Sequence, residues 1–329
     1  MLKKITALFI ISILFYCDST AYAWFQKQKP YTPPSEKQYK ELRPLFVNFS
    51  SQDLEKSINI SKSAENIDLI NNILVFLQHK KLIRQTKKLP PIFLIYSQNN
   101  QVLSYKGGSY SDNKNIILLN ANLLMANTQQ RQNIPKNIQA AIDFVVFSSI
   151  LSHELTHFED FLEVKEVENM DSFILSEQKA YEKAEKTIDY FLKMTKAEAD
   201  EIIPIPQFYD SMQIAEEYFI NIRKNYIKMV QAADILLNNE NKVCKTFGID
   251  KNMFKMITFL PHVQFNAKYG GHIVRIESNL FNFQQTLKFD INTLTGIVSI
   301  LNPPKEIEAI RKQAKNIQII DKNSYLIIR

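Results

Sequence analysis

Two histidines, with a glutamate beside the first, lie mid-chain in the run His153-Glu154-Leu155-Thr156-His157. These residue types at this spacing can bind a metal ion and activate water. On a helix, residues four positions apart share one face, so both imidazoles can reach the same ion. Neutral imidazoles are common zinc ligands, and zinc lowers the pKa of a bound water toward roughly 7. Glu154 can then take the proton of that water as it attacks a peptide carbonyl.

The sequence before the motif predicts the helix that this chemistry needs. Pro135 follows Asn133 and suits the first turn of a helix. His153 continues a stripe with Val145 and Ser149, which we expect to face inward. The alternative is a pair of exposed histidines on an amphipathic helix. Small or apolar residues recur at the helical period before the motif, at Ile138, Ala141, Ile142, Val145, Val146, Ser149 and Ile150.

A third protein ligand must come from another segment, and Glu177 is the best candidate. It lies in a second predicted helix, over residues 172–194, and shares a helical face with Ala180 and Ala184. Small residues on that face would let the second helix approach the first closely enough for a carboxylate to reach the metal. The alternative is that Glu177 is an ordinary surface charge.

The motif and the glutamate after it resemble the gluzincins, the zinc peptidase clan typified by thermolysin, in which 19 residues also separate the second histidine from the ligand glutamate. The resemblance covers roughly residues 92–195. It implies a two-helix zinc site with His153, His157 and Glu177 as ligands and Glu154 as the general base. The chain departs from thermolysin four residues after the ligand glutamate. Thermolysin has an aspartate there that orients the first histidine, whereas this chain has Tyr181, so the group that orients His153 is left open.

A rival zinc geometry, that of the metzincins, has a glycine three residues and a third histidine six residues after the second histidine. Asp160 and Glu163 occupy those positions here. The helical pattern continues through them, and a straight helix would point Glu163 away from the metal. The sequence therefore favours Glu177.

The surrounding pattern predicts an α+β protein. A helical pattern covers residues 50–88, and apolar runs at 92–96 and 115–120 indicate strands separated by a polar turn region. A third helix is expected over about 207–238, after which strand-like runs prevail. We therefore expect a zincin-like core, with a small sheet packed on the active-site helix over 135–165, additional helices and a C-terminal β-rich segment. The expected boundaries are a metallopeptidase domain over 46–240 and a C-terminal segment of unknown role over 241–329.

Peptidases of this kind commonly hold the substrate along an exposed strand edge. The run Asn115 to Asn120 is the candidate, because it is the last strand before the active-site helix; the alternative is an ordinary buried hairpin strand. The transition state usually needs a hydrogen-bond donor besides the zinc. Suitable residue types occur later in the chain, but spacing selects none of them: Tyr181, His262, Tyr269 and His272.

The N-terminus reads as an export signal over residues 1–23. Lys3 and Lys4 precede a short apolar run, and Ala21-Tyr22-Ala23 suits cleavage before Trp24. An uncleaved anchor is the alternative. Residues 24–45, polar and proline-containing, are expected to form a flexible tether. After cleavage no apolar stretch reaches the roughly 20 residues of a membrane helix, so we expect a periplasmic or extracellular protein without an integral span.

Composition limits the other function classes. The formal net charge is +6, but basic residues are scattered among acids, which indicates a solvated surface rather than a nucleic-acid-binding stripe. Cys17 lies in the signal, so Cys244 would be the lone thiol of the mature chain, without an internal disulfide.

Two functions follow from these observations. The first is an exported zinc metallopeptidase that hydrolyses peptide bonds in a peptide or protein substrate. The second is a non-catalytic envelope protein with a structural or absent metal, which binds a partner through its strand-rich C-terminal region. Glu154 favours the first, because a binding protein has no use for a carboxylate beside the first ligand.

Overall fold

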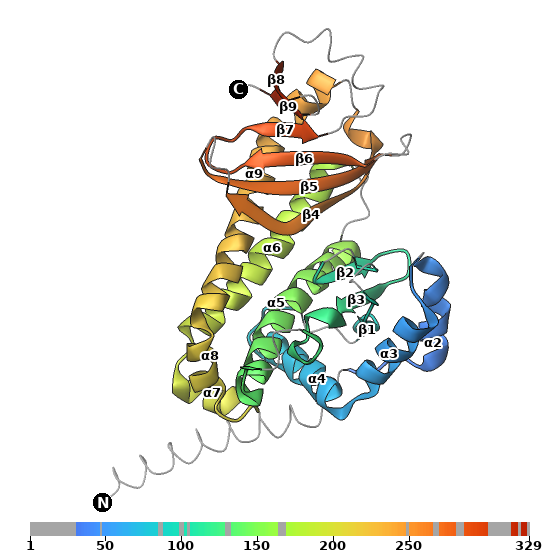
Figure 1. The fold of residues 1–329 in the computed structure, drawn as a ribbon, viewed down its shortest axis with the longest axis vertical. Helices are drawn as coiled ribbons and strands as arrows, with labels where there is room; N and C mark the ends of the chain where they lie inside the picture. The colour runs from blue at the N-terminus through green and yellow to red at the C-terminus, as the bar shows by residue number, and fades with distance from the viewer. Residues whose placement is uncertain are drawn as a thin grey trace, which may run out of the picture.

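The computed structural model describes residues 31–46, 48–84, 88–98, 102–103, 106–128, 133–163, 169–247, 250–265, 270–280, 286–301, 317–321 and 324–327. The protein is a mixed α+β structure with two small sheets (Figure 1). The helices are α2 (Glu36–Leu42), α3 (Ser51–Lys62), α4 (Ala64–His79), α5 (Lys136–Glu163), α6 (Met170–Lys193), α7 (Lys196–Ile202), α8 (Phe208–Ile214) and α9 (Glu216–Phe247). The strands are β1 (Ile92–Ile95), β2 (Gly108–Ser111), β3 (Ile116–Asn120), β4 (Phe254–Phe265), β5 (His272–Leu280), β6 (Leu287–Asn292), β7 (Val298–Leu301), β8 (Ile317–Asp321) and β9 (Ser324–Ile327).

The first sheet has the strand order β1-β3-β2, with β1 parallel and β2 antiparallel to β3. Helices cover both of its faces, which explains why β1 and β3 are continuous apolar runs. Alternate residues of these strands, such as Leu94 and Leu119, enter the core that α4 and α5 complete. The intervening residues, such as Phe93 and Leu118, pack with α2 and α3 on the opposite face.

This topology corrects the expected substrate strand. The run Asn115 to Asn120 contains β3, which is the central strand and is buried along its whole length. Its backbone pairs with β1 on one side and with β2 on the other, so it has no free edge for a substrate. The edge strands are β1 and β2, and β2 forms in the region expected to be a turn, around Gly108.

Helix α5 forms as expected after Pro135 and runs between the first sheet and α6 (Figure 1). By length and composition alone it could cross a membrane, contrary to the expectation that no later stretch could do so. However, 72% of its most apolar 18-residue window is buried inside the protein. A helix that is apolar on most sides and covered by other elements serves as a core helix.

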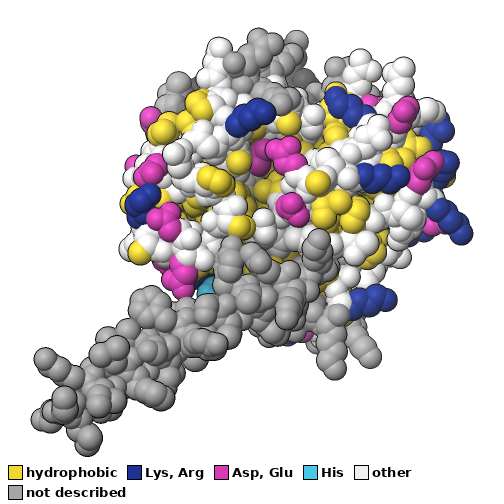
Figure 2. All heavy atoms as spheres, turned by 90° about the horizontal axis from the view of Figure 1, so that it is seen from below, with side chains coloured by type: hydrophobic (Ala, Val, Ile, Leu, Met, Phe, Trp, Pro, Cys, Tyr) yellow, Lys and Arg dark blue, Asp and Glu magenta, His cyan; other side chains and the backbone are white. Residues whose placement is uncertain are grey.

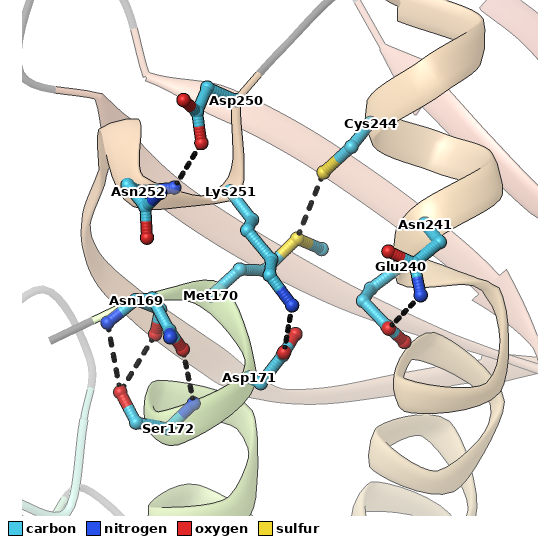
Figure 3. Close-up of polar contacts among 10 residues, drawn as sticks. All are labelled: Asn169, Met170, Asp171, Ser172, Glu240, Asn241, Cys244, Asp250, Lys251 and Asn252. Atoms are coloured by element: carbon cyan, nitrogen blue, oxygen red, sulfur yellow. Dashed lines mark hydrogen bonds and ion pairs between the residues drawn. The ribbon is translucent and has the colours of Figure 1, made fainter. Parts of the chain in front are cut away.

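Helix α6 starts at a capping box, in which the side chains of Asn169 and Ser172 each accept a hydrogen bond from the other's backbone N–H. Figure 3 shows this cap together with two contacts that hold the first turn of α6. Lys251 Nζ lies 2.6 Å from Asp171 Oδ2, and the Cys244 thiol lies 3.7 Å from the sulfur of Met170. The start of the helix that carries Glu177 is thus fixed to both α9 and the segment before β4.

The second sheet has the order β4-β5-β6-β7-β9-β8, with antiparallel neighbours throughout. Its apolar face packs on α9 and on the first half of α6, in a core of its own (Figure 1). Helix α9 crosses the expected boundary at residue 240, and Val243 beyond it is fully buried in this core. Helix α6 and the C-terminal sheet are therefore parts of one packed unit.

The structure describes only part of the signal and tether segments expected at the N-terminus. The expected signal over 1–23 and the first part of the expected tether lie outside the described residues. From residue 31 onward the chain is not a tether, because Tyr31 and Tyr39 are buried and α2 packs on the first sheet. The Tyr39 hydroxyl donates a hydrogen bond to the backbone carbonyl of Leu94 and accepts one from its backbone N–H, each at 3.1 Å. These two bonds hold α2 against β1.

Acidic and basic side chains intermingle on the face of the molecule shown in Figure 2, with apolar side chains between them. The scattered charges of the sequence thus remain scattered on this face of the folded protein.

Candidate metal centre

The structure brings together the three side chains expected to bind a metal. One ligand atom each from His153, His157 and Glu177 lies within 4.8 Å of the others. The two histidines lie one turn apart on α5, and Glu177 reaches them from α6. The close approach of the helices follows the expected small face, because Ala180 and Ala184 are both fully buried.

The spacing of these atoms suits a tetrahedral zinc ion. The Nε2 atoms of the two imidazoles lie 3.2 Å apart. Glu177 Oε2 lies 3.6 Å from His153 Nε2, and Glu177 Oε1 lies 3.7 Å from His157 Nε2. Ligand atoms at about 2.0–2.1 Å from a tetrahedral zinc lie roughly 3.3 Å apart. Small shifts would therefore bring all three onto one ion, and the donor set of two imidazoles and one carboxylate fits zinc.

Burial keeps both imidazoles in the neutral form that binds metals. It lowers the pKa of His157 to about 4, with Asp160 acting weakly in the opposite direction. Burial also lowers the pKa of His153 well below its ordinary value, aided by the neighbouring His157. Both rings are therefore uncharged at neutral pH, when their nitrogen lone pairs are free to bind a cation.

Neighbouring groups orient the two rings. His157 Nδ1 lies 3.0 Å from Ser176 Oγ, in the residue just before Glu177. The ring of His153 is hydrogen-bonded to the backbone of Ala180 and contacts the ring of Tyr181 edge-on, with 4.5 Å between their centroids. A backbone carbonyl and an aromatic ring thus hold the His153 ring in place.

Glu154 lies buried beside the first ligand, with 5% of its surface exposed. Burial raises the pKa of its carboxyl group to about 8, and the nearby charge of Glu177 contributes. A backbone hydrogen bond from Tyr110 and the charge of Lys106 act in the opposite direction. The strand that passes over the carboxylate is β2: a Cβ added to Gly108 would lie 2.8 Å from Glu154 Oε1.

The two residues at the metzincin-type ligand positions form ion pairs with basic side chains instead. Glu163 forms an ion pair with Arg84 near the end of α5, and Asp160 pairs with Lys179 at 3.3 Å. Neither belongs to the metal-binding group, in agreement with the direction expected for Glu163 on a straight helix.

The structure places the side chains of two of the four residues considered as oxyanion donors. Tyr181 lies beside His153, but its hydroxyl donates to the carbonyl of Phe259 at 3.2 Å. His272 begins β5 and lies outside the metal-binding group. Tyr269 and the side chain of His262 lie outside the part of the chain that the structure describes.

Sequence reasoning missed three contributors to the site. Ser176 could have been found as the neighbour of Glu177, whereas the Ala180 backbone has no sequence signature. The third is Lys106, whose charge lowers the pKa of both Glu154 and Glu177; it precedes β2 in a segment expected to be a turn.

Comparisons of the whole chain with known protein families, with curated proteins and with solved structures find no match.

Proposed function

We propose that the protein is a zinc metallopeptidase of gluzincin type, exported to the periplasm or the cell exterior. One observation carries the proposal: His153, His157 and Glu177 converge within 4.8 Å of one another, while the buried carboxylate of Glu154 lies beside them. The proposal of export depends on residues 1–23, which lie outside the described residues.

The side chains divide the chemical work. His153, His157 and Glu177 would hold the ion, which when bound would acidify a water and polarise the substrate carbonyl. Glu154 would accept a proton from the water as its oxygen attacks the carbonyl carbon. It would then return that proton to the amine nitrogen as the C–N bond breaks. Its position suits both roles, because a buried carboxylate beside the bound water can take a proton and give it back.

The substrate backbone would lie along β2 rather than β3. The first sheet leaves one side of β2 unpaired within the described residues, and Gly108 passes directly over Glu154. A peptide added to this edge would carry its backbone past the carboxylate. The ring of Tyr110 contacts Phe158 and Phe161 at centroid distances of 6.0 and 6.1 Å, which makes the adjoining surface partly apolar.

The decisive experiment compares wild type with Glu154→Gln. Zinc content would be measured by atomic absorption. Hydrolysis would be measured with casein and with a panel of internally quenched peptides. The amide keeps the shape of the carboxylate but cannot accept the proton, so we expect stoichiometric zinc and a loss of activity of at least about 1,000-fold.

Glu163→Gln is the matched control on the same helix, and we expect it to keep both zinc and activity. If wild type binds no zinc, or if Glu154→Gln is as active as wild type, the proposal is wrong. Zinc binding without hydrolysis of any substrate by wild type would favour the non-catalytic envelope protein instead.

A further inference from the structure

Lys106 connects the two sheets beside the metal centre. It lies two residues before Gly108, where an added Cβ would lie 2.8 Å from Glu154 Oε1. Its ammonium group donates a hydrogen bond to Thr258 Oγ1 of β4 at 3.2 Å. The next residue of β4, Phe259, accepts the hydroxyl of Tyr181, whose ring contacts His153. The Lys106 ammonium is thus held close enough to the site for its charge to act on both Glu154 and Glu177.

Among the described residues, no carboxylate forms an ion pair with the Lys106 ammonium. Its one hydrogen bond among the described residues goes to a neutral hydroxyl, so two of its three N–H donors remain for another group. Its charge nevertheless acts on both Glu154 and Glu177. An ammonium that is only half-buried and is held by a neutral anchor next to a reaction centre is poised to meet negative charge that develops there.

We propose that Lys106 is a catalytic residue that donates a hydrogen bond to the oxyanion of the transition state, and that Thr258 positions it. The inference rests on the proposed peptidase function. It assigns the donor that sequence reasoning left open, and it gives the C-terminal sheet a part in catalysis, because Thr258 belongs to that sheet.

The charge balance of the reaction supports this role. When water attacks, the π electrons of the carbonyl move onto its oxygen, while the water proton goes to Glu154. A divalent ion with Glu177 and ionised Glu154 gives a site without net charge, and Lys106 makes it positive. The added charge favours an anionic transition state over a neutral peptide, and Lys106 keeps its own proton throughout.

The test uses the full-length zinc-loaded protein and the variants Lys106→Met and Lys106→Arg. Methionine keeps much of the side-chain volume but removes charge and donors. For the fastest-cleaved quenched peptide, we expect Lys106→Met to lower kcat by about 100-fold to 1,000-fold with KM changed by less than about 3-fold. Lys106→Arg should retain part of the rate.

A binding measurement gives a readout that does not depend on turnover. N-phosphoryl-Leu-Trp mimics the tetrahedral anion, whereas mercaptoacetyl-Leu-Trp binds metal without a second anionic oxygen. By calorimetry, we expect Lys106→Met to weaken binding of the phosphoryl ligand by about 100-fold and binding of the thiol ligand by less than about 3-fold. Zinc affinity should be unchanged.

The control for a lost surface charge is Lys114→Met, in the exposed turn between β2 and β3, which should match wild type in all assays. The anchor is tested with Thr258→Val, expected to lower kcat and phosphoryl-ligand affinity by about tenfold, and with Thr258→Ser, expected to restore both.

Three outcomes would overturn the proposal. One is an unchanged kcat in Lys106→Met, and another is an equal loss of binding affinity for the phosphoryl and thiol ligands. The third is a rise in KM confined to peptides with a free C-terminal carboxylate and absent for their amides, which would make Lys106 a substrate-binding residue. Failure of the peptidase proposal looks different, because wild type itself would then either bind no zinc or bind zinc without hydrolysing any peptide.

Discussion

At the scale of single residues, the candidate metal centre is a place where burial acts against ionisation of both histidines and both glutamates. It raises the pKa of Glu154 and Glu177 to about 8 and lowers that of His157 to about 4. Four ionisable side chains gathered in one buried place are costly unless something compensates for lost hydration. A divalent cation does so, because it stabilises both carboxylates and uses the neutral imidazoles. Clusters of this kind are typical of functional sites.

The first prediction concerns Ser176, whose hydroxyl lies 3.0 Å from His157 Nδ1. Replacement by alanine leaves that nitrogen without its partner and the ring less well oriented. We expect Ser176→Ala to weaken zinc binding by about 10-fold to 100-fold, measured by competition with a fluorescent chelator.

The control is Ser61→Ala, which removes a fully buried hydroxyl from α3, on the far side of the first sheet. It should leave zinc affinity unchanged. Equal zinc affinity in wild type and Ser176→Ala would show that this hydroxyl does not orient the ligand.

The residues of the site differ in how far the sequence could predict them. The placement of His153, Glu154 and His157 on one helix was predictable because it depends on local spacing. Glu177 needed only the added inference that small residues allow two helices to approach. The orienting backbone of Ala180 was not predictable, because every residue type has the same carbonyl. The position of Lys106 depends on how the segment before β2 packs against β4, and no local sequence pattern specifies that packing.

At the scale of elements, α5 and α6 were predicted almost to their ends, because apolar residues follow the helical period and Pro135 suits the start of α5. The error was the choice of the substrate strand. The apolar run Ile116 to Leu119 of β3 is what a central strand with two covered faces requires. The edge strand β2 has the sequence Gly-Ser-Tyr-Ser, whose weak strand propensity hid it.

The second prediction tests how β2 lies over α5. A methyl group at Gly108 would meet Glu154 Oε1 at 2.8 Å and its Cγ at 2.9 Å, so Gly108→Ala must displace either the strand or the general base. We expect zinc to be retained and kcat/KM to fall by at least about 100-fold, since shifts near 1 Å at a catalytic group cost that much. Peptide hydrolysis and zinc content check this.

Gly107→Ala is the matched control. Its added methyl group would meet the end of the Ile150 side chain at 2.9 Å, which can rotate away. We expect a loss of less than about tenfold. If both substitutions reduce activity equally, contact with Glu154 is not the cause.

At the scale of the whole molecule, α6 belongs to both large cores. Ile188 and Phe191 in its second half pack with α4, α5 and the first sheet, while Met170 and Ile174 in its first half pack with α9 and the second sheet. Glu177 lies between these halves. The C-terminal sheet, which the sequence placed in a separate segment, therefore supports the helix that carries the third ligand. Its role was not predictable because it arises from contacts between residues far apart in the chain.

The third prediction concerns stability against pH and a carboxylate away from the metal centre. Asp143 lies on α5 and accepts a hydrogen bond from the backbone N–H of Met125 at 2.8 Å, which ties α5 to the segment after β3. Burial, with a smaller contribution from the charge of Glu65, raises the pKa of Asp143 from 3.8 to about 7. Between these values the unfolded chain is ionised and the folded protein is not. The stabilising contribution of Asp143 is therefore fully present below pH 3.8 and is lost as the pH rises through about 7.

Asp143→Asn keeps the acceptor for Met125 but cannot ionise, so its stability should lack this loss. The free energy of unfolding of the variant, minus that of wild type, should rise between pH 4 and pH 8 by about 2–4 kcal/mol and level off above pH 8. Urea unfolding of the metal-free proteins in a chelator measures this difference. The site histidines and glutamates titrate in both proteins, so their effects cancel in the subtraction. A difference that does not vary with pH would show that Asp143 is ionised in the folded protein throughout this range.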